Sequence, residues 1–172
     1  MTRSIVSGAL AGALLLLASV AGQAEARSAA VLATTLIDSS TEGDYFGARE
    51  DEAARVRMMT ERLAEAFAAR GWEIVDTAPA AGTIERVMNP SRCNGCDAKI
   101  ARGLGADVAV TAEVQKVSNL ILTINVYVRD AESGELLRLG NADIRSNTDA
   151  SWRRGLDYVL ENRIFPVPDA PG

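Results

Sequence analysis

The chain has 172 residues and no histidine, and its 23 acidic and 18 basic side chains give a formal net charge of −5 at pH 7. A mildly acidic chain lacks the positive charge that binds nucleic acid or an anionic bilayer, so we expect neither as a partner. Without histidine there can be no Ser-His or Cys-His nucleophile pair, histidine zinc ligand or histidine general base. We therefore predict no catalytic residues, no cofactor and no metal centre.

Residues 1–26 have the pattern of a secretory signal peptide. Arg3 supplies a positive start, residues 5–20 form an apolar core, and Ala24-Glu25-Ala26 is a small-x-small cleavage site. The apolar core is short for a membrane-spanning helix, and no cysteine near the cleavage site could carry a lipid. We expect an exported periplasmic protein that keeps no membrane anchor after cleavage.

Residues 27–172 are predicted to form a single domain, whose first half alternates strands with helices. Residues 30–38 are mostly apolar, which is typical of an interior strand. Apolar side chains recur at steps of three and four within 50–70, and Gly71 follows, so this segment is predicted to be the longest helix. A short strand at 72–76 and a short helix at 97–104 follow it.

The second half of the domain is predicted to be an antiparallel meander, around which the other elements are organised. Its strands are expected at 107–114, 120–129 and 136–144, with Ser118-Asn119 and Ser133-Gly134 in the connections. Strict alternation in the second strand indicates one buried and one partly wet face. With a last helix at 150–163, the fold class is α/β: a mixed sheet with a C-terminal antiparallel meander packed on helices, in the order β-α-β-α-β-β-β-α.

Two segments that flank the first hairpin resemble a known envelope domain. They are Gly105-Ala106-Asp107 before the first strand of the meander and Asp130-Ala131-Glu132-Ser133-Gly134-Glu135 after the second. The similar domain occurs in the N-terminal part of the Tol-Pal translocation protein and in the curli-secretion lipoprotein. The resemblance implies the same fold through about residue 145 and a role in envelope assembly or interaction, without a catalytic site in this domain.

Three further segments resemble the signature of a family of small secreted proteobacterial proteins of unknown function. They are Cys93-Asn94-Gly95-Cys96-Asp97, residues 114–122 (VQKVSNLIL) and residues 143–152 (DIRSNTDASW). This resemblance spans nearly the whole chain after the signal peptide. The resemblance implies the fold and the cellular compartment of the chain, but it implies no molecular mechanism.

Cys93 and Cys96 form a C-x-x-C pair just before the predicted helix at 97–104. In an oxidising compartment such a pair forms a structural disulfide, exchanges electrons with a partner or binds a metal. A helix N-terminus stabilises the thiolate that electron exchange needs. Asn94-Gly95 replaces the Gly-Pro of thioredoxin-like proteins, so we favour the structural disulfide. Haem attachment is disfavoured because Asp97 stands where a histidine is needed.

A polar segment before the last predicted helix is the second candidate contact for a partner or ligand. Its candidate residues are Asp143, Arg145, Asn147, Asp149 and Trp152. The oxygen atoms of Asp143, Asn147 and Asp149 suit a calcium ion, but the spacing lacks the glycine and the terminal glutamate of an EF-hand. We favour the simpler interpretation, in which Thr148 or Asp149 caps the helix and Trp152 packs under the sheet.

Two other surfaces are open to either of two interpretations. The polar face of the meander is a contact platform or an ordinary solvated face, and its residues are Glu113, Gln115, Thr123, Asn125, Tyr127 and Arg129. Tyr45 and Phe46, in the acidic loop at 42–47, anchor a partner or tuck onto the core, and we favour the second.

These observations predict an exported, non-enzymatic binding or assembly accessory of the cell envelope, whose partner is another envelope protein. The alternative is a periplasmic thiol-disulfide exchange protein that uses Cys93 and Cys96. A third hypothesis is a module that binds an ion or small molecule near residues 143–149.

Overall fold

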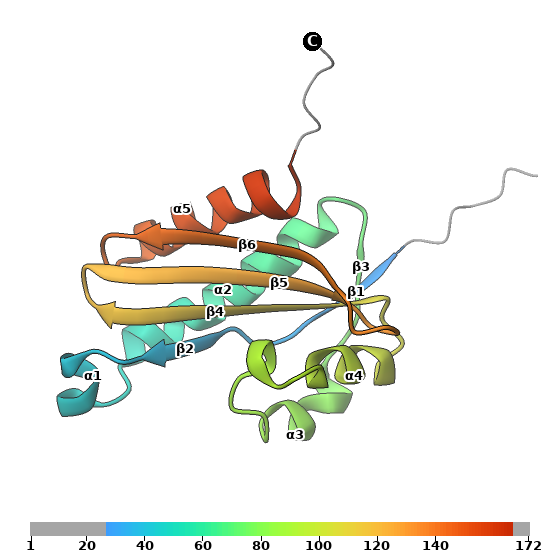
Figure 1. Cartoon of the computed structure of the whole chain (residues 1–172), viewed down its shortest axis with the longest axis horizontal. Coiled ribbons are helices and arrows are strands. Elements are labelled where there is room, and N and C mark those ends of the chain that lie inside the picture. The colour runs from blue at the N-terminus through green and yellow to red at the C-terminus, as the bar shows by residue number, and fades with distance from the viewer. Residues whose placement is uncertain (1–26, 167–172) are drawn as a thin grey trace, which may run out of the picture.

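The computed structural model describes residues 27–166, which form one α/β domain built on a mixed sheet (Figure 1). The strands are β1 (Ser28–Val31), β2 (Thr35–Asp38), β3 (Glu73–Ile74), β4 (Val108–Ser118), β5 (Ile121–Asp130) and β6 (Leu136–Ile144). The helices are α1 (Thr41–Phe46), α2 (Glu50–Ala68), α3 (Ala81–Ile84), α4 (Cys96–Gly103) and α5 (Asp149–Val159). The 3₁₀ turns are Ala78–Ala80 and Pro90–Arg92, and a π turn spans Leu160–Ile164.

The antiparallel meander β4-β5-β6 forms the larger part of the sheet, as predicted. The sheet continues from β4 through parallel pairing with β1, and β1 pairs in turn with β3. Alternate residues of β5 are fully buried from Leu122 to Val126, because their side chains pack on α2 and α5. Leu120, predicted to share this buried face, precedes β5 and is 68% exposed in the turn.

The helices cover both faces of the sheet. One face packs against α2 and α5, and its core includes Met59, Phe67 and Trp152. The other face packs against α4, with Ile100 and Ala101 beside Leu32 of the first connection. No described helix is long and apolar enough to cross a membrane.

The single strand predicted at 30–38 is instead two strands separated by residues 32–34. Thr34 donates its backbone N–H to Thr60 Oγ1 on α2 at 3.0 Å, so the chain bends towards the helix between β1 and β2. Both strands pair in parallel with β4, β1 near its start and β2 near its end. Among the described strands, β4 is the only partner of β2, so the outer edge of β2 is unpaired.

Short helices add to the predicted element order. Residues 42–47, predicted as a loop, contain most of α1, which begins after Ser40 because the Ser40 side chain accepts a hydrogen bond from the Gly43 N–H. Helix α3 lies between β3 and Cys93, where no element is predicted from the sequence. The last helix is capped by Thr148, whose hydroxyl accepts from the Ser151 N–H, so the capping interpretation is confirmed.

The predicted signal peptide, residues 1–26, lies outside the described residues and stays a prediction, as does the exact extent of the domain at 27–172.

Candidate functional site

A buried lysine connects three elements at the end of the sheet where β2 stops. Lys116 on β4 has no exposed surface, and its Nζ donates to Glu52 Oε1 of α2 at 2.7 Å and to Asp38 Oδ2 of β2 at 2.9 Å. Burial by itself lowers the pKa of Lys116, but the hydrogen bonds to the two carboxylates outweigh burial and raise its pKa above the ordinary value. Lys116 is therefore a charged cross-link between β2, β4 and α2.

Asn147 extends this cross-link to the β4–β5 turn and to α5. Its Nδ2 donates to Glu52 Oε1 at 2.6 Å and to Asn119 Oδ1 at 3.0 Å. Its Oδ1 accepts from Trp152 Nε1 at 2.9 Å and from Arg55 Nη1 at 3.2 Å. The amide thus donates twice and accepts twice, so its orientation is set by its partners.

Arg55, which is buried, joins α2 to the start of α5. Its Nε donates to Asp149 Oδ1 at 2.8 Å and its Nη2 to Asp51 Oδ2 at 2.9 Å. Hydrogen bonds from Arg49 and Arg55 hold the pKa of Asp51 well below its usual range. The Asp51 and Asp149 side chains together compensate the Arg55 guanidinium in its buried position.

We call this set of hydrogen-bonded side chains the polar network. Its members are Asp38, Asp51, Glu52, Arg55, Lys116, Asn119, Asn147, Asp149 and Trp152. It joins segments that are far apart in the sequence, at the end of the sheet where β2 and β4 both stop. Moving one of these segments away would leave a buried charge without its partner, which is strongly destabilising. The polar network therefore holds the segments in one arrangement.

Three of the five residues predicted as the second candidate contact belong to this network: Asn147, Asp149 and Trp152. Asp143 lies apart from them, where it accepts a hydrogen bond from Thr123 Oγ1 at 2.7 Å. Arg145 is exposed and forms no hydrogen bond or ion pair with any described residue. Asp143, Asn147 and Asp149, the oxygen donors considered for calcium, therefore accept hydrogen bonds from other side chains of the protein. Within residues 27–166 no group of three or more acidic or cysteine residues is placed to hold a metal ion.

The central members Lys116, Glu52 and Asp38 were not predicted as site residues. A signal existed in β4, where Val110, Ala112 and Val114 are buried and Lys116 follows in the same alternation. A lysine in phase with buried apolar residues requires a buried carboxylate partner. The sequence pattern does not say which acidic residue that partner is.

Large apolar side chains are exposed beside the polar network. On α1, Tyr45 is 81% and Phe46 78% exposed, and at the β4–β5 turn Val117 is 58% and Leu120 68% exposed. The two segments are neighbours, because Asn119 Nδ2 donates to Glu42 Oε1 of α1 at 3.3 Å (Figure 1). We call Tyr45, Phe46, Val117 and Leu120 the apolar tip.

The prediction that Tyr45 and Phe46 tuck onto the core is wrong. Helix α1 has no buried residue. The space beneath it is occupied by Asp38, whose carboxylate would lie 2.6 Å from a Cβ atom added at Gly43. Because the floor under α1 is ionic and hydrogen-bonded, the two rings do not pack onto it and stay exposed to solvent.

A second polar cluster covers part of the opposite face of the sheet. Glu113 is fully buried and accepts from Arg92 Nε and Nη2, at 2.8 and 2.7 Å, and from Asn89 Nδ2 at 2.8 Å. Burial raises the pKa of Glu113, but the hydrogen bonds from Arg92, Asn89 and Gln115 outweigh it and lower the pKa below its ordinary value. The predicted polar platform is therefore partly covered, since the segment that contains Asn89 and Arg92 lies over Glu113.

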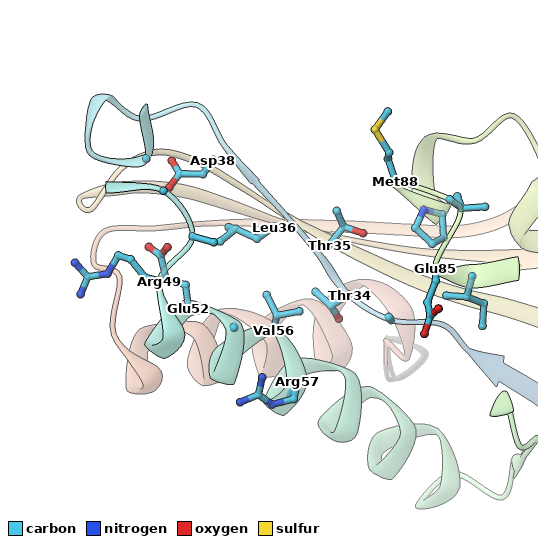
Figure 2. A pocket seen from close by; sticks show the side chains of 18 of the residues that line it. Thr34, Thr35, Leu36, Asp38, Arg49, Glu52, Val56, Arg57, Glu85 and Met88 are labelled. Atoms are coloured by element: carbon cyan, nitrogen blue, oxygen red, sulfur yellow. The ribbon is translucent and has the colours of Figure 1, made fainter. Parts of the chain in front are cut away.

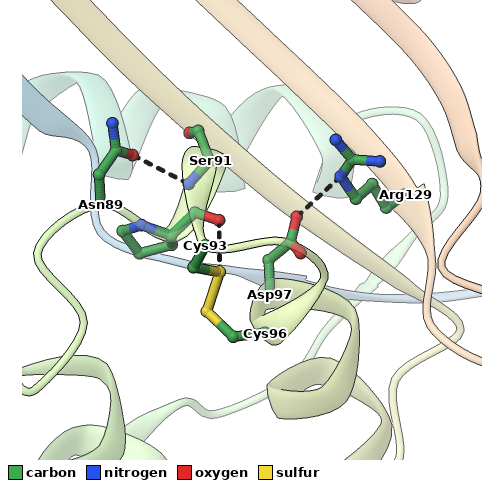
Figure 3. Close-up of a disulfide and its surroundings, with 7 residues drawn as sticks. Asn89, Ser91, Cys93, Cys96, Asp97 and Arg129 are labelled. Carbon is green, nitrogen blue, oxygen red and sulfur yellow. Dashed lines mark hydrogen bonds and ion pairs between the residues drawn. A yellow bond between two sulfur atoms is a disulfide. The ribbon is translucent and has the colours of Figure 1, made fainter.

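Cys93 and Cys96 form a disulfide at the start of α4 (Figure 3). Both residues between them have left-handed backbone, with φ of 56° at Asn94 and 87° at Gly95. Asparagine and glycine are the residues that adopt this conformation most readily, whereas the proline of thioredoxin-like motifs has φ near −65°. The pair therefore closes a turn unlike that motif, and electron exchange by it stays a prediction.

The segment around the disulfide is held onto the sheet on both sides. Arg92, immediately before Cys93, pairs with Glu113 of β4, and Asp97, immediately after Cys96, is buried and pairs with Arg129 Nε of β5 at 3.2 Å (Figure 3). The disulfide therefore closes the turn between two ion pairs to neighbouring strands.

Residues 27–164 match the family DUF3280, described as "Protein of unknown function (DUF2380)". The chain belongs to this family. The expectation of a family of unknown function is thus confirmed, whereas the three signature segments and the resemblance to the Tol-Pal domain stay predictions. No curated protein matches the DUF3280 chain.

Solved structures share the fold at low sequence identity. The C-terminal domain of LpoB from Salmonella enterica aligns with a TM-score of 0.50 and 16% identity, over 73% of this chain and 87% of that one. The lipoprotein GNA1162 from Neisseria meningitidis aligns with a TM-score of 0.49 and 16% identity, over 71% and 82%. The C-terminal domain of LpoB from Escherichia coli aligns with a TM-score of 0.48 and 15% identity, over 69% of this chain and 83% of that one. The first of these shows that the α/β fold is shared.

Proposed function

We propose that this DUF3280 chain is an exported, non-enzymatic binding or assembly accessory of the cell envelope, which docks on another envelope protein through the apolar tip. The observation that carries the proposal is the exposure of four large apolar side chains, each more than half exposed, at one end of the sheet. Such a group beside polar residues is typical of a protein contact surface.

The polar network supports this role because it makes the apolar tip a fixed surface. The turn that carries Val117 and Leu120 is bonded to α1 and, through Asn119, to Asn147. The residue before Val117 is Lys116, whose buried ammonium is tied to α2 and β2. A contact surface that is already ordered loses less conformational entropy when a partner binds.

The charges next to the apolar tip favour a protein partner over a lipid surface. Glu42 and Asp44 lie on α1, and Glu50 begins α2. An anionic bilayer would be repelled by these carboxylates, whereas a protein groove with basic residues at its rim would complement them. The envelope compartment is supported by the signal-peptide pattern at 1–26 and by the disulfide, which needs an oxidising environment.

The experiment is a quantitative capture from an envelope extract with immobilised protein lacking residues 1–26. The test variant is Tyr45→Ser/Phe46→Ser/Leu120→Ser. The control is Leu139→Ser/Tyr158→Ser, which removes apolar side chains that are 51% and 48% exposed elsewhere on the surface. We expect the same main partner with the unsubstituted protein and the control, and at least a tenfold loss with the test variant. Equal recovery on all three proteins would refute a role for the apolar tip.

A further inference from the structure

A groove follows the outer edge of β2 (Figure 2). Its volume is about 690 Å³, and its walls are more apolar than polar. One wall is α2, with Ala53 and Val56, and the other is the segment after α3, with Val87 and Met88. Its volume and its mostly apolar lining are typical of a ligand-binding site.

The floor of this groove is an unpaired strand edge. In the parallel pairing of β2 with β4, the Ser39 N–H donates to Lys116 O at 2.9 Å, so the odd-numbered residues of β2 direct their main-chain groups to β4. Leu36 and Asp38 therefore direct their N–H and C=O groups away from β4, into the groove. The described residues provide no strand beyond this edge.

We propose that the groove binds an extended segment of a partner protein, which adds to the sheet as a strand next to β2. An unpaired edge offers hydrogen bonds that an extended main chain satisfies, and apolar walls above and below it accept alternate side chains. A helix would leave the N–H and C=O groups of Leu36 and Asp38 without partners, because its own main-chain groups are already bonded. The edge therefore selects an extended conformation.

One side of the site is fixed before any peptide binds, and the other side is adaptable. On the α2 side, Lys116 ties Asp38 of β2 to Glu52, and Thr60 of α2 bonds to Thr34. On the other side Met88 is 96% exposed. Methionine is flexible and fits varied apolar surfaces, so this wall can adapt to the side chains that it covers.

The charges at the groove favour a peptide with a basic side chain. Asp38 and Glu52 are compensated by Lys116, and Arg49 by Asp51. Of the remaining charged lining residues, Asp44 and Glu85 are acidic and Arg57 is basic, and none of them forms an ion pair with another described residue. They leave a net negative charge, so we expect selected peptides to be basic and apolar in alternation.

This inference deepens the proposed function by naming the kind of segment that a partner contributes. The groove and the apolar tip are separate surfaces that share only α1, since the groove is lined by Gly43, Asp44 and Gly47 and the tip contains Tyr45 and Phe46. A substitution can therefore remove binding at one surface without changing the other. If Tyr45→Ser/Phe46→Ser abolishes partner capture while peptide binding at β2 is unchanged, the two roles are distinguished.

The test is a selection from a library of random linear dodecapeptides on protein lacking residues 1–26. Selected peptides are then measured against two substitutions on the same helix. Ala53→Trp fills the groove, and Ala54→Trp places the same side chain on an exposed residue that does not line it. We expect Ala53→Trp to weaken binding at least tenfold and Ala54→Trp to change it less than twofold.

Two further measurements test the strand geometry. Hydrogen exchange should show new protection of the Leu36 and Asp38 amides when a selected peptide is bound. N-methylation of alternate peptide residues should weaken binding at least tenfold when the methyl groups replace the N–H groups that face β2, and less than threefold in the other phase. Equal sensitivity in both phases, no protection of β2, equal binding to Ala53→Trp, or a library that yields no binder would each overturn the proposal.

Discussion

Lys116 Nζ lies 2.7 Å from Glu52 Oε1, although the two residues are 64 positions apart in the sequence and both are buried. The ammonium also bonds to Asp38, so one cation compensates two carboxylates. Asn147 supplies a further donor to Glu52. The link between β2, β4 and α2 at the end of the sheet that carries the apolar tip therefore depends on the ammonium of Lys116.

Replacing Lys116 by methionine should lower the free energy of unfolding by about 3–5 kcal/mol, because it leaves Glu52 buried without its cation. Urea denaturation at pH 7 measures the change. The double variant Lys116→Met/Glu52→Gln should recover part of the loss, since the uncompensated charge is then gone. If the loss of unfolding free energy in the double variant equals the sum of the losses in the two single variants, the two residues are not coupled.

Glu113→Gln should lower the free energy of unfolding at neutral pH by about 1–2 kcal/mol, because Arg92 loses its charged acceptor while remaining largely exposed to solvent. The pKa of Glu113 in the folded protein lies below its ordinary value of 4.5. A lowered pKa stabilises the fold above the unfolded-state pKa, and this contribution is lost as the pH falls through the folded-state value.

The difference between unsubstituted protein and Glu113→Gln should therefore be constant at neutral pH and shrink as the pH falls below 4.5. Urea denaturation in steps from about pH 7 to about pH 3 measures this dependence. A difference that does not change across this range would show that the carboxylate of Glu113 is not the titrating group.

Replacing both cysteines, as Cys93→Ser/Cys96→Ser, should lower the free energy of unfolding by no more than about 2 kcal/mol, because a ring of four residues restricts the unfolded chain only slightly. The largest loss of order is expected in the segment that Arg92 and Asp97 hold onto the sheet, and hydrogen exchange measures it.

The same disulfide should remain oxidised in a glutathione buffer of cytosolic poise, as structural bridges do. Thiol alkylation followed by mass spectrometry detects the reduced fraction. Ready reduction together with oxidation of a dithiol substrate would instead support the exchange hypothesis for Cys93 and Cys96.

Two glycine substitutions should change stability in opposite directions. A Cβ atom at Gly155 would lie 2.6 Å from Ile144 Cγ2 and 2.9 Å from Ile124 Cδ1, where α5 lies close to the sheet, so Gly155→Ala should destabilise by about 1–3 kcal/mol. At Gly103 the added atom meets nothing within 4 Å, so Gly103→Ala should stabilise by about 0.5–1 kcal/mol. Thermal unfolding of both variants checks the contrast.

Much of the fold could be predicted because its signals are local. The alternation of β5, the apolar stripe of α2 and the glycines that end helices depend on residues a few positions apart, and the structure has these elements close to where they were expected. The Cys93–Cys96 turn is local as well. Asn94 and Gly95 fit its left-handed backbone whatever the rest of the chain does.

The break between β1 and β2 and the outward direction of Tyr45 and Phe46 were decided only by the tertiary structure. Each depends on a partner distant in the sequence. That partner is Thr60 for the break, and for the two rings it is Lys116, which pairs with Asp38 in the ionic floor under α1. The alternation within β4 is enough to place Lys116 in phase with buried residues. Only the packing of α2 against the sheet decided that Glu52 would meet it, because periodicity specifies the face on which a side chain lies, whereas topology specifies its neighbours.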